Sequence, residues 1–507
     1  MNTVGSLAIV LHTHLPWLPG HGRWPVGEEW LYQAWSGSYL RLVDLLADLA
    51  EQDRRNVLTL GVSPTIAAML DDPACLAAEH TWLADWQLRA MGMCTESDEV
   101  RARTGQREFV EATAALNSFQ TRWLRGGSGP LRDLADSGVI ELLAGPLMHP
   151  FQPLLREPTR LAALEWGLQD ARLRRGASPA GIWAPECGYT PGLEEGYARA
   201  GVTHFMVDGP TMRAAGHHTF AGRTVGSTSV VAFARDLEVT YRVWSPRRGY
   251  PGGKWYRDFH TFDHQWGMRP ARVTSRSTPP EHKAPYQPDR AQTAVLADAA
   301  DFVEVVRRRL IEADRAHPLV VVGYDTELFG HWWHEGPAWL AEVLRLLPSA
   351  GIEVTTLARA IDEGQVDGPT DLPSGSWGSG KDWRVWDGAA VQDLVQANAH
   401  LEARALATVR RELDRPAAMG QRQPVLDQLM REVLLALSSD WAFMVTKDSA
   451  AQYARARARG HDQRAHALMD ALDAWDGNLA AHLADQYRAQ DGCFGHLDAR
   501  LLSVLHR

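Results

Sequence analysis

Two acidic residues closely follow one of the most apolar runs of the chain. Residues 319–322, Leu-Val-Val-Val, lead into Asp325 and Glu327, and Phe-Gly-His-Trp-Trp follows at residues 329–333. A short β-branched run that ends in acids is typical of a buried strand that delivers carboxylates to the rim of a barrel. Because aromatic rings stack on the apolar faces of sugars, carboxylates beside tryptophans favour carbohydrate chemistry.

A further carboxylate, Glu186, follows another short strand-like run in the sequence Gly-Ile-Trp-Ala-Pro-Glu-Cys-Gly-Tyr, residues 181–189. A strand end of this kind would place Glu186 on the same rim as Asp325. Cleavage of a glycosidic bond with retention needs two carboxyl groups about 5 Å apart, one as nucleophile and one as acid/base. An isolated acid at a strand end is more often a helix cap or an ion-pair partner, so the prediction depends on both motifs together.

Three histidines lie at other strand ends. His12 and His14 end the first strand-like run, and His149 follows the third. Residues two apart on a strand face the same side, so His12 and His14 could bind a metal or support the rim by hydrogen bonds. His149 carries the same two interpretations.

Tryptophan is unusually frequent, with 20 copies against 12 phenylalanines and 11 tyrosines. Trp377, Trp383 and Trp386 lie in a glycine-rich passage with few apolar neighbours. Their rings could stack on a pyranose or could pack a barrel against a second domain, and the residues alone favour neither.

The elements that must position these residues alternate between strand-like and helix-like runs. This alternation predicts a parallel α/β sheet, and seven or eight repeats favour a barrel. Residues 65–125 read as a helical insertion, residues 269–290 as a long irregular loop, and the chain after Trp386 as helices alone. The expected strands are residues 7–12, 57–61, 139–143, 181–183, 204–207, 239–243, 319–322 and 352–354.

Composition excludes several classes of function. The 507 residues are 45% hydrophobic, carry a net charge of −10, and contain no apolar run near the roughly 20 residues of a membrane helix. An acidic chain without a basic patch is an unlikely partner for nucleic acid. Four scattered cysteines without a CxxC pair predict neither disulfides nor a zinc ribbon. We see no secretion signal and expect a cytoplasmic protein without a membrane partner.

Together these motifs resemble glycoside hydrolase family 57 and, within it, the 1,4-α-glucan branching enzymes. The resemblance covers most of the chain, and several long motifs in a fixed order make it specific. In chain order they are His-Thr-His-Leu-Pro-Trp at 12–17, Trp-Ala-Pro-Glu-Cys-Gly-Tyr at 183–189, Val-Trp-Ser-Pro at 243–246, Gly-Tyr-Pro-Gly at 249–252, Asp-Thr-Glu-Leu-Phe-Gly-His-Trp-Trp at 325–333, Ser-Trp-Gly at 376–378 and Ser-Ser-Asp-Trp at 438–441.

The resemblance implies a distorted (β/α)7 barrel at residues 1–380, which includes the helical insertion, and an all-helical domain at residues 381–507. It implies Glu186 as nucleophile and Asp325 as general acid/base, with no metal and no cofactor. Six residues match positions that contact the glucan, the last two more weakly: His12, His149, Trp377, Trp386, Trp24 and Trp441.

The implied reaction is a double displacement on an α-1,4-glucan donor. Asp325 protonates the leaving oxygen while Glu186 attacks the anomeric carbon, and Asp325 then acts as base. A 6-hydroxyl of a glucan acceptor gives an α-1,6 branch, and water gives hydrolysis. Two departures concern the acceptor: residues 209–231 lack the tyrosine that similar branching enzymes carry there, and Ala271 stands where a tryptophan commonly precedes Arg-Val-Thr, with Trp266 upstream.

Three alternatives stand beside this interpretation. An α-amylase or 4-α-glucanotransferase of the same family would use the same pair of carboxylates. A metal-dependent carbohydrate deacetylase or mannosidase on a related barrel would use His12 and His14 as ligands, although no nearby aspartate completes an obvious set. A non-catalytic glucan-binding protein would need the tryptophans but neither Glu186 nor Asp325.

Overall fold

The computed structural model describes residues 3–245, 247–416 and 420–505. Residue 246, the last of the Val-Trp-Ser-Pro motif, therefore lies outside the described residues. Residues 1–2 of the predicted barrel and residues 417–419 and 506–507 of the predicted helical domain do as well. Among the described residues, no helix has the length and apolar character needed to cross a membrane.

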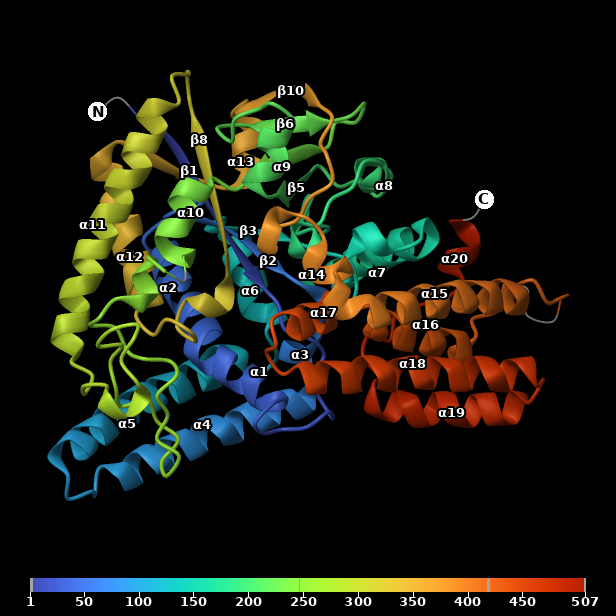
Figure 1. The fold of residues 1–507 in the computed structure, drawn as a ribbon, viewed down its shortest axis with the longest axis horizontal. Helices are drawn as coiled ribbons and strands as arrows, with labels where there is room; N and C mark the ends of the chain where they lie inside the picture. The colour runs from blue at the N-terminus through green and yellow to red at the C-terminus, as the bar shows by residue number, and fades with distance from the viewer. Residues whose placement is uncertain (1–2, 246, 417–419, 506–507) are drawn as a thin grey trace.

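Seven strands of the described residues surround the centre of a distorted (β/α)7 barrel. Figure 1 shows several of them with helices around them. β1, Gly5–Thr13, pairs in parallel with β2, Leu58–Val62, and with β8, Leu319–Asp325. β3, Ile140–Leu143, pairs with β2, and a bridge between Ala144 and Ile182 joins it to the second sheet. The second sheet contributes β4, Gly181–Ile182, β5, His204–Val207, and β7, Val231–Ala234. The predicted barrel is confirmed.

The barrel is distorted because its two sheets meet through single contacts rather than full ladders. On one side, the Asp236 amide donates to the Val321 carbonyl at 2.8 Å, which links the end of β7 to β8. Three further strands lie outside the ring of seven: β9, Ile352–Thr355, pairs with the start of β1, β6, Gly222–Val225, is antiparallel to β7, and β10, Val366–Thr370, extends β6.

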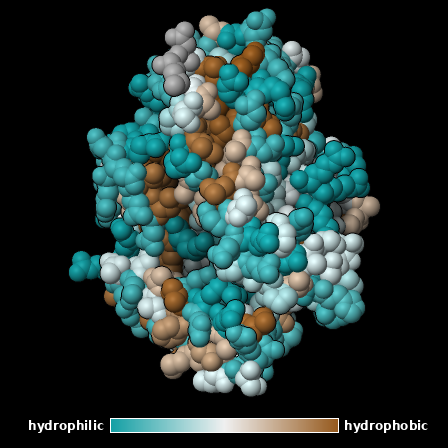
Figure 2. Space-filling model, turned by 90° about the vertical axis from the view of Figure 1, so that its left-hand side faces the viewer, coloured by the Kyte–Doolittle hydropathy of each residue, from teal (hydrophilic) through white to brown (hydrophobic). Residues whose placement is uncertain are grey.

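Helices cover the outside of the barrel and bury their apolar faces on it. All nine residues of β1 are buried, as expected for a strand covered on both faces. The main covering helices are α2, Leu40–Glu51, α6, Ser128–Asp136, α7, Glu157–Arg175, α11, Pro288–Glu312, and α12, Gly336–Leu346. Shorter helices are α1, Glu28–Ala34, α8, Leu193–Arg199, α9, Gly209–Ala214, α13, Leu357–Asp362, and α14, Arg384–Asp387. The side that faces the viewer in Figure 2 is mostly hydrophilic, with apolar atoms in narrow recessed bands.

The insertion after β2 is helical, as predicted. It contains α3, Pro64–Asp71, α4, Pro73–Met93, and α5, Glu99–Ser118. α4 and α5 run side by side as a hairpin away from the barrel (Figure 1). Ser63 and Asp72 begin α3 and α4 as N-caps, since each side chain accepts from backbone amides of the first turn.

The C-terminal region is a bundle of helices on the opposite side of the barrel from α11 (Figure 1). Its helices are α15, Gln392–Leu413, α16, Pro424–Ala436, α17, Ser439–Thr446, α18, Ala451–Asp473, α19, Gly477–Gln490, and α20, Leu501–Val504. α16 lies at the centre of the bundle, and nearly all its residues are buried. α17 lies where the bundle meets the barrel.

One predicted strand is wrong. Residues 239–243 are not a strand but part of α10, Leu237–Trp244. Asp236 caps this helix by accepting from the Glu238 and Val239 amides, and Val239 and Val243 are both buried four residues apart on one helix face. The cap and the spacing of buried residues outweigh the strand preference of the β-branched and aromatic residues.

Candidate active site

A cavity of about 1130 Å³ opens at the carboxyl ends of the barrel strands, and we call it the central cavity. Asp325 ends β8 and is aligned with His12 of β1, so register places both at this rim. Glu186 reaches the same cavity from the turn after β4, and Asp440 reaches it from α17 of the helical bundle. The structure therefore brings together the two carboxylates that the sequence predicted on one rim.

Glu186 is held in a strained turn by donors from two other segments. Its φ of 62° lies in the left-handed region, which costs a non-glycine residue about 1 kcal/mol or more. One carboxylate oxygen accepts from the Trp377 indole nitrogen at 2.8 Å, and the other accepts from the Ser439 hydroxyl at 2.7 Å. The Trp377 amide also donates to the Glu186 carbonyl at 2.9 Å. These bonds fix the direction of a carboxylate that is only 7% exposed.

Asp325 faces Glu186 without comparable support. Among the described residues, no hydrogen bond is donated to its carboxyl group. Burial, followed by repulsion from Glu186, raises the pKa of Asp325 to about 7. Burial also raises the pKa of Glu186 to about 7, against the bonds from Ser439 and Trp377. When the pair holds one proton, that proton lies on Asp325, because Glu186 has the two donors that stabilise an anion.

Glu327 is a third buried acid beside this pair. The Tyr39 hydroxyl donates to it at 2.5 Å and the His14 amide at 3.3 Å. Burial and repulsion from Asp325 raise the pKa of Glu327 to about 8. A protonated Glu327 adds no negative charge near Asp325 and ties β8 to β1 and to the helical turn that contains Tyr39.

Three histidines form a stack next to Glu186. The His14 and His149 rings lie 3.7 Å apart between centroids, and the Nε2 atoms of His12 and His149 are 2.9 Å apart. His14 contacts Ser63 through Nδ1 at 2.7 Å and Asp440 through Nε2 at 3.0 Å. Burial is the main cause that lowers the pKa of His12 and of His149 well below the usual value, so both rings are neutral.

This stack bears on the metal interpretation. Ligand atoms of His14, His149 and Asp440 lie within 4.8 Å of one another. Both ring nitrogens of His14 and of His149 already have protein hydrogen-bond partners in the described structure. Binding a metal there would break those bonds, so the arrangement fits a hydrogen-bond network better than a metal site.

Aromatic rings line the route into the central cavity. Trp24 is 58% exposed at the mouth and lies 5.9 Å from the Phe262 ring, and Trp332 is 37% exposed next to Trp244. Trp377 lies deeper, with the Arg235 guanidinium 4.9 Å from its ring. Exposed rings around a cavity with buried acids are the arrangement expected for a bound sugar chain.

Trp386 and Trp441 lie outside the lining of the central cavity, although the sequence placed them among the glucan contacts. Each is 2% exposed. Trp386 stacks on Phe151 at 4.6 Å, and Trp441 donates to the Leu435 carbonyl at 2.7 Å beneath the Arg457 guanidinium. Both rings are therefore placed to pack the barrel against the bundle behind Trp377 and Ser439.

Several residues of the cavity escaped the sequence prediction. Asp440, which lines the cavity, and Ser439, which bonds to Glu186 behind the lining, belong to the Ser-Ser-Asp-Trp motif, in which only the tryptophan was considered. A polar group at the start of a helix was the available signal. Tyr241 and Trp244 line the cavity from α10, the element wrongly predicted as a strand. A tyrosine thus reaches the cavity although residues 209–231 contain none. Trp266 instead packs at α4 and donates to Glu96 at 2.8 Å.

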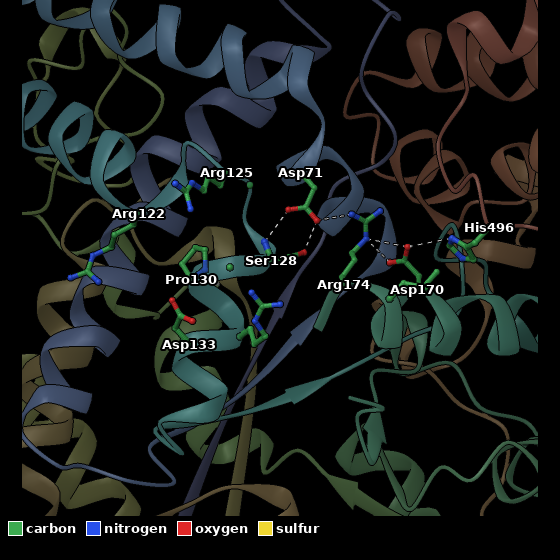
Figure 3. Close-up of a pocket in the computed structure, with 13 residues that line it drawn as sticks. Asp71, Arg122, Arg125, Ser128, Pro130, Asp133, Asp170, Arg174 and His496 are labelled. Carbon is green, nitrogen blue, oxygen red and sulfur yellow. Dashed lines mark hydrogen bonds and ion pairs between the residues drawn. The ribbon is translucent and has the colours of Figure 1, made fainter. Parts of the chain in front are cut away.

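A second cavity, of about 650 Å³, lies between α3, α6, α7 and the C-terminal region, and we call it the arginine cavity (Figure 3). Four arginines and three aspartates line it. Arg174 lies between Asp71, at 2.6 Å, and Asp170, at 2.9 Å, and His496 lies beyond Asp170. Its buried acid is paired with a cation, and no tryptophan, tyrosine or phenylalanine is among the residues that line it.

Comparison with known proteins places the chain among carbohydrate enzymes. The family model described as "Glycosyl hydrolase family 57" matches residues 8–372, and the model "1,4-alpha-glucan branching enzyme, C-terminal" matches residues 396–502. The chain is 53% identical to a probable 1,4-alpha-glucan branching enzyme of Mycobacterium tuberculosis over 522 residues, which cover 98% of each protein.

Solved structures agree with these matches. The crystal structure of a GH57-type branching enzyme from Pyrococcus horikoshii has a TM-score of 0.91 at 28% identity and covers 98% of this chain and 97% of its own. The α-amylase AmyC from Thermotoga maritima has a TM-score of 0.87 at 26% identity and covers 98% of this chain and 99% of its own.

Proposed function

The chain belongs to glycosyl hydrolase family 57, and we propose that it is a 1,4-α-glucan branching enzyme whose catalytic pair is Glu186 and Asp325. The observation that carries the activity is the match of residues 396–502 to the C-terminal model of branching enzymes, together with 53% identity to a probable branching enzyme along the whole chain. The observation that carries the catalytic pair is the meeting of a buried and a half-buried carboxyl group, each with a raised pKa, in one cavity.

Glu186 is the proposed nucleophile. Its two oxygens accept from Trp377 and Ser439, so the carboxylate is stabilised as an anion and held in one direction. It attacks the anomeric carbon of the donor glucan as the bond to the leaving oxygen breaks, and a covalent glycosyl-enzyme forms. The left-handed backbone at Glu186 aims the side chain into the cavity rather than along the strand.

Asp325 is the proposed general acid/base. A raised pKa keeps its proton available near neutral pH, so it can protonate the leaving glucan oxygen in the first step. In the second step the Asp325 carboxylate removes the proton of the incoming hydroxyl, which attacks the anomeric carbon and releases Glu186. When the hydroxyl is the 6-hydroxyl of a glucan, an α-1,6 branch forms.

The proposed glucan contacts lie at two depths. Trp377, His12 and His149 line the part near the carboxyl pair, and Trp24 stands at the mouth. Trp386 and Trp441 support this surface from behind by packing against Phe151 and Arg457. The α-1,4-glucan is both donor and acceptor in this scheme, and no metal or cofactor takes part in it.

Two further parts of the proposal concern organisation. The catalytic barrel spans residues 1–380 with its insertion at residues 65–125, and the helical domain spans residues 381–507. The helical domain contributes Asp440 to the lining of the central cavity, and the Ser439 hydroxyl donates to Glu186 from behind that lining, so neither part forms the complete site alone. A cytoplasmic location is consistent with an acidic chain that acts on a glucan.

A second candidate is hydrolysis by the same pair, which the similarity to AmyC favours. Incubation of the purified protein with amylose separates the two. A branching enzyme yields α-1,6 linkages, measured as short chains released by a debranching enzyme, with few new reducing ends. An α-amylase yields reducing ends from the start and no debranchable chains, and that result would replace the proposed activity.

A further inference from the structure

We propose that Ser439 is a positioning residue for Glu186, and that a chain of hydrogen bonds from His12 through His149 fixes the direction in which its hydroxyl donates. The inference rests on the proposed role of Glu186 as nucleophile and adds a residue from the helical bundle to that site. Ser439 acts through Glu186 and is not required to touch the glucan.

Geometry defines a continuous chain with four members. His12 Nε2 lies 2.9 Å from His149 Nε2, His149 Nδ1 lies 2.9 Å from the Ser439 hydroxyl, and that hydroxyl lies 2.7 Å from a Glu186 carboxylate oxygen. All four residues are less than 9% exposed. Water therefore has little access with which to satisfy these groups in another way.

Only one direction of the chain leaves Glu186 as an acceptor. Each neutral imidazole carries one N–H. If His12 donates through Nε2, His149 must accept there and carry its proton on Nδ1, from which it donates to Ser439. The Ser439 hydroxyl then has its own proton free for Glu186. In this direction the one group left without a hydrogen bond is His12 Nδ1, a buried acceptor nitrogen that has no partner among the described residues.

The opposite direction requires a protonated Glu186. If His149 donates to His12, its Nδ1 has a lone pair and the Ser439 hydroxyl must donate to it. A serine oxygen lone pair would then face an ionised carboxylate at 2.7 Å, unless Glu186 carries a proton and donates it. This direction also leaves His12 Nδ1–H as a buried donor without a partner. The chain thus couples the tautomers of two histidines to the ionisation of the nucleophile.

The helical bundle supplies Ser439 through a fixed contact. The Ser439 amide donates to the His149 carbonyl at 3.1 Å, and Pro150 bridges to Ser438, so the start of α17 is tied to the strand-end loop that holds His149. His149 itself has a left-handed φ of 52°, as Glu186 does. Two strained strand-end residues and one helix start therefore meet at one hydroxyl group.

Other charged groups also act on Glu186, and the test must separate them from Ser439. From the neighbouring elements the facing groups are Asp325 on β8, His14 after β1, His149 after β3, Asp440 on α17 and Arg235 after β7. None of these groups is replaced when only the Ser439 hydroxyl is removed, although His149 Nδ1 loses its hydrogen-bond partner. A change in the Glu186 ionisation after that substitution therefore reports the loss of the bonds that this hydroxyl makes.

A direct titration of Glu186 provides the test and does not depend on activity. Protein labelled with ¹³C at the glutamate side-chain carboxyl is titrated by NMR, and the Glu186 signal is the one that Glu186→Gln removes. We expect Ser439→Ala to move the titration midpoint to higher pH by about one unit, because the lost bond stabilised the anion. Ser439→Thr retains the hydroxyl and should restore the wild-type midpoint.

Two variants separate positioning from folding. Thr446→Val removes a hydroxyl at the other end of α17, which donates to the Val385 carbonyl at 2.7 Å, and should lower the melting temperature slightly without moving the midpoint. His149→Phe breaks the chain above Ser439 and should move the midpoint upward by less than Ser439→Ala does.

The outcomes are distinct. An unchanged midpoint in Ser439→Ala, or an equal shift in Thr446→Val, would overturn the inference. Amylose assays of the same proteins should give a lower kcat for Ser439→Ala, with the acidic limb of kcat/KM at higher pH, and recovery in Ser439→Thr. If wild-type protein produced no branches, the proposed function would fail, while the titration would still decide the role of Ser439.

Discussion

The central cavity and the arginine cavity both contain carboxylates, but the groups that surround the carboxylates differ in charge. In the arginine cavity, Asp170 is buried but bonded to Arg174, which also holds Asp71. In the central cavity, Glu186 is buried and Asp325 is half-buried, and neither is ion-paired with an arginine or lysine among the described residues. Glu186 has neutral donors instead, and the pKa of each carboxyl lies near 7.

This difference in ion pairing distinguishes carboxylates that stabilise the fold from carboxyl groups that can transfer a proton. Burial raises the pKa of Asp170 as well, but the Arg174 guanidinium opposes that rise and favours the ionised carboxylate. A buried acid next to another acid keeps a proton within reach, at a cost in stability that the surrounding fold must meet. The lining of the arginine cavity also contains no tryptophan, tyrosine or phenylalanine, whereas exposed tryptophans surround the central cavity.

The largest effect should come from the central cavity. Glu186→Gln and Asp325→Asn should each lower kcat on amylose by about 1,000-fold or more, since each removes a group that acts on the reacting bond. Their melting temperatures should equal or exceed that of the wild type, because a buried carboxyl is replaced by a neutral amide. Full activity in both variants would remove the catalytic pair from the proposal.

The arginine cavity should give the reverse pattern. Arg174→Leu leaves Asp170 and Asp71 without their shared cation and should lower the free energy of unfolding by about 3 kcal/mol. Urea denaturation measures this loss, while kcat per folded molecule should not change. Arg174→Leu combined with Asp170→Leu should recover part of the stability. A loss of kcat at full stability would contradict the structural role.

A smaller effect should follow when Glu186 keeps its carboxylate and loses one donor. Trp377→Phe preserves an aromatic ring in the cavity and removes the indole N–H that lies 2.8 Å from Glu186. A hydrogen bond to a charged group is worth about 2 kcal/mol, so kcat/KM should fall about 30-fold, mostly in kcat. If KM alone rose, Trp377 would serve the glucan and not the nucleophile.

The pH dependence should show how the two acids share a proton. Activity needs Glu186 ionised and Asp325 protonated, so kcat/KM should rise with pH as Glu186 loses its proton and fall as Asp325 loses its own. With both pKa values near 7, the profile should be a narrow bell centred near neutral pH, falling about tenfold per pH unit on either side. A flat profile between pH 5 and 9 would show that these groups do not titrate in the rate-limiting reaction.

The same contrast explains what the sequence could and could not predict. β1 and β8 are runs of β-branched and apolar residues that end in a histidine and an acid, so both the strands and the rim residues followed from local pattern. β10 contains Gly368 and Pro369, which strands disfavour, and it forms only because it adds to the edge of β6. Such tertiary contacts are absent from any local window.

The sequence predicted the two proposed catalytic carboxyl groups but not the residues that hydrogen-bond to them. Glu186 and Asp325 each lie in a distinctive motif next to a strand. Because the carboxyl ends of barrel strands meet at one rim, the two residues could be paired from the sequence alone. Ser439 meets Glu186 across 253 residues of sequence, through the docking of α17 on the barrel. The burial of Trp386 and Trp441 also results from packing between the barrel and the bundle. Their motifs show that aromatic residues are present but not whether the rings face the cavity or the packed interior.

The smallest effect should come from the rim of the arginine cavity. Arg132 is exposed there, and none of the described residues pairs with it. Arg132→Ala should therefore change the free energy of unfolding by less than about 0.5 kcal/mol and leave kcat unchanged, in contrast to Arg174→Leu in the same cavity. Urea denaturation and the amylose assay, each with and without added phosphate, measure both quantities. A phosphate-dependent difference between Arg132→Ala and the wild type would mean that this cavity binds an anion, and its paired charges would then serve more than the fold.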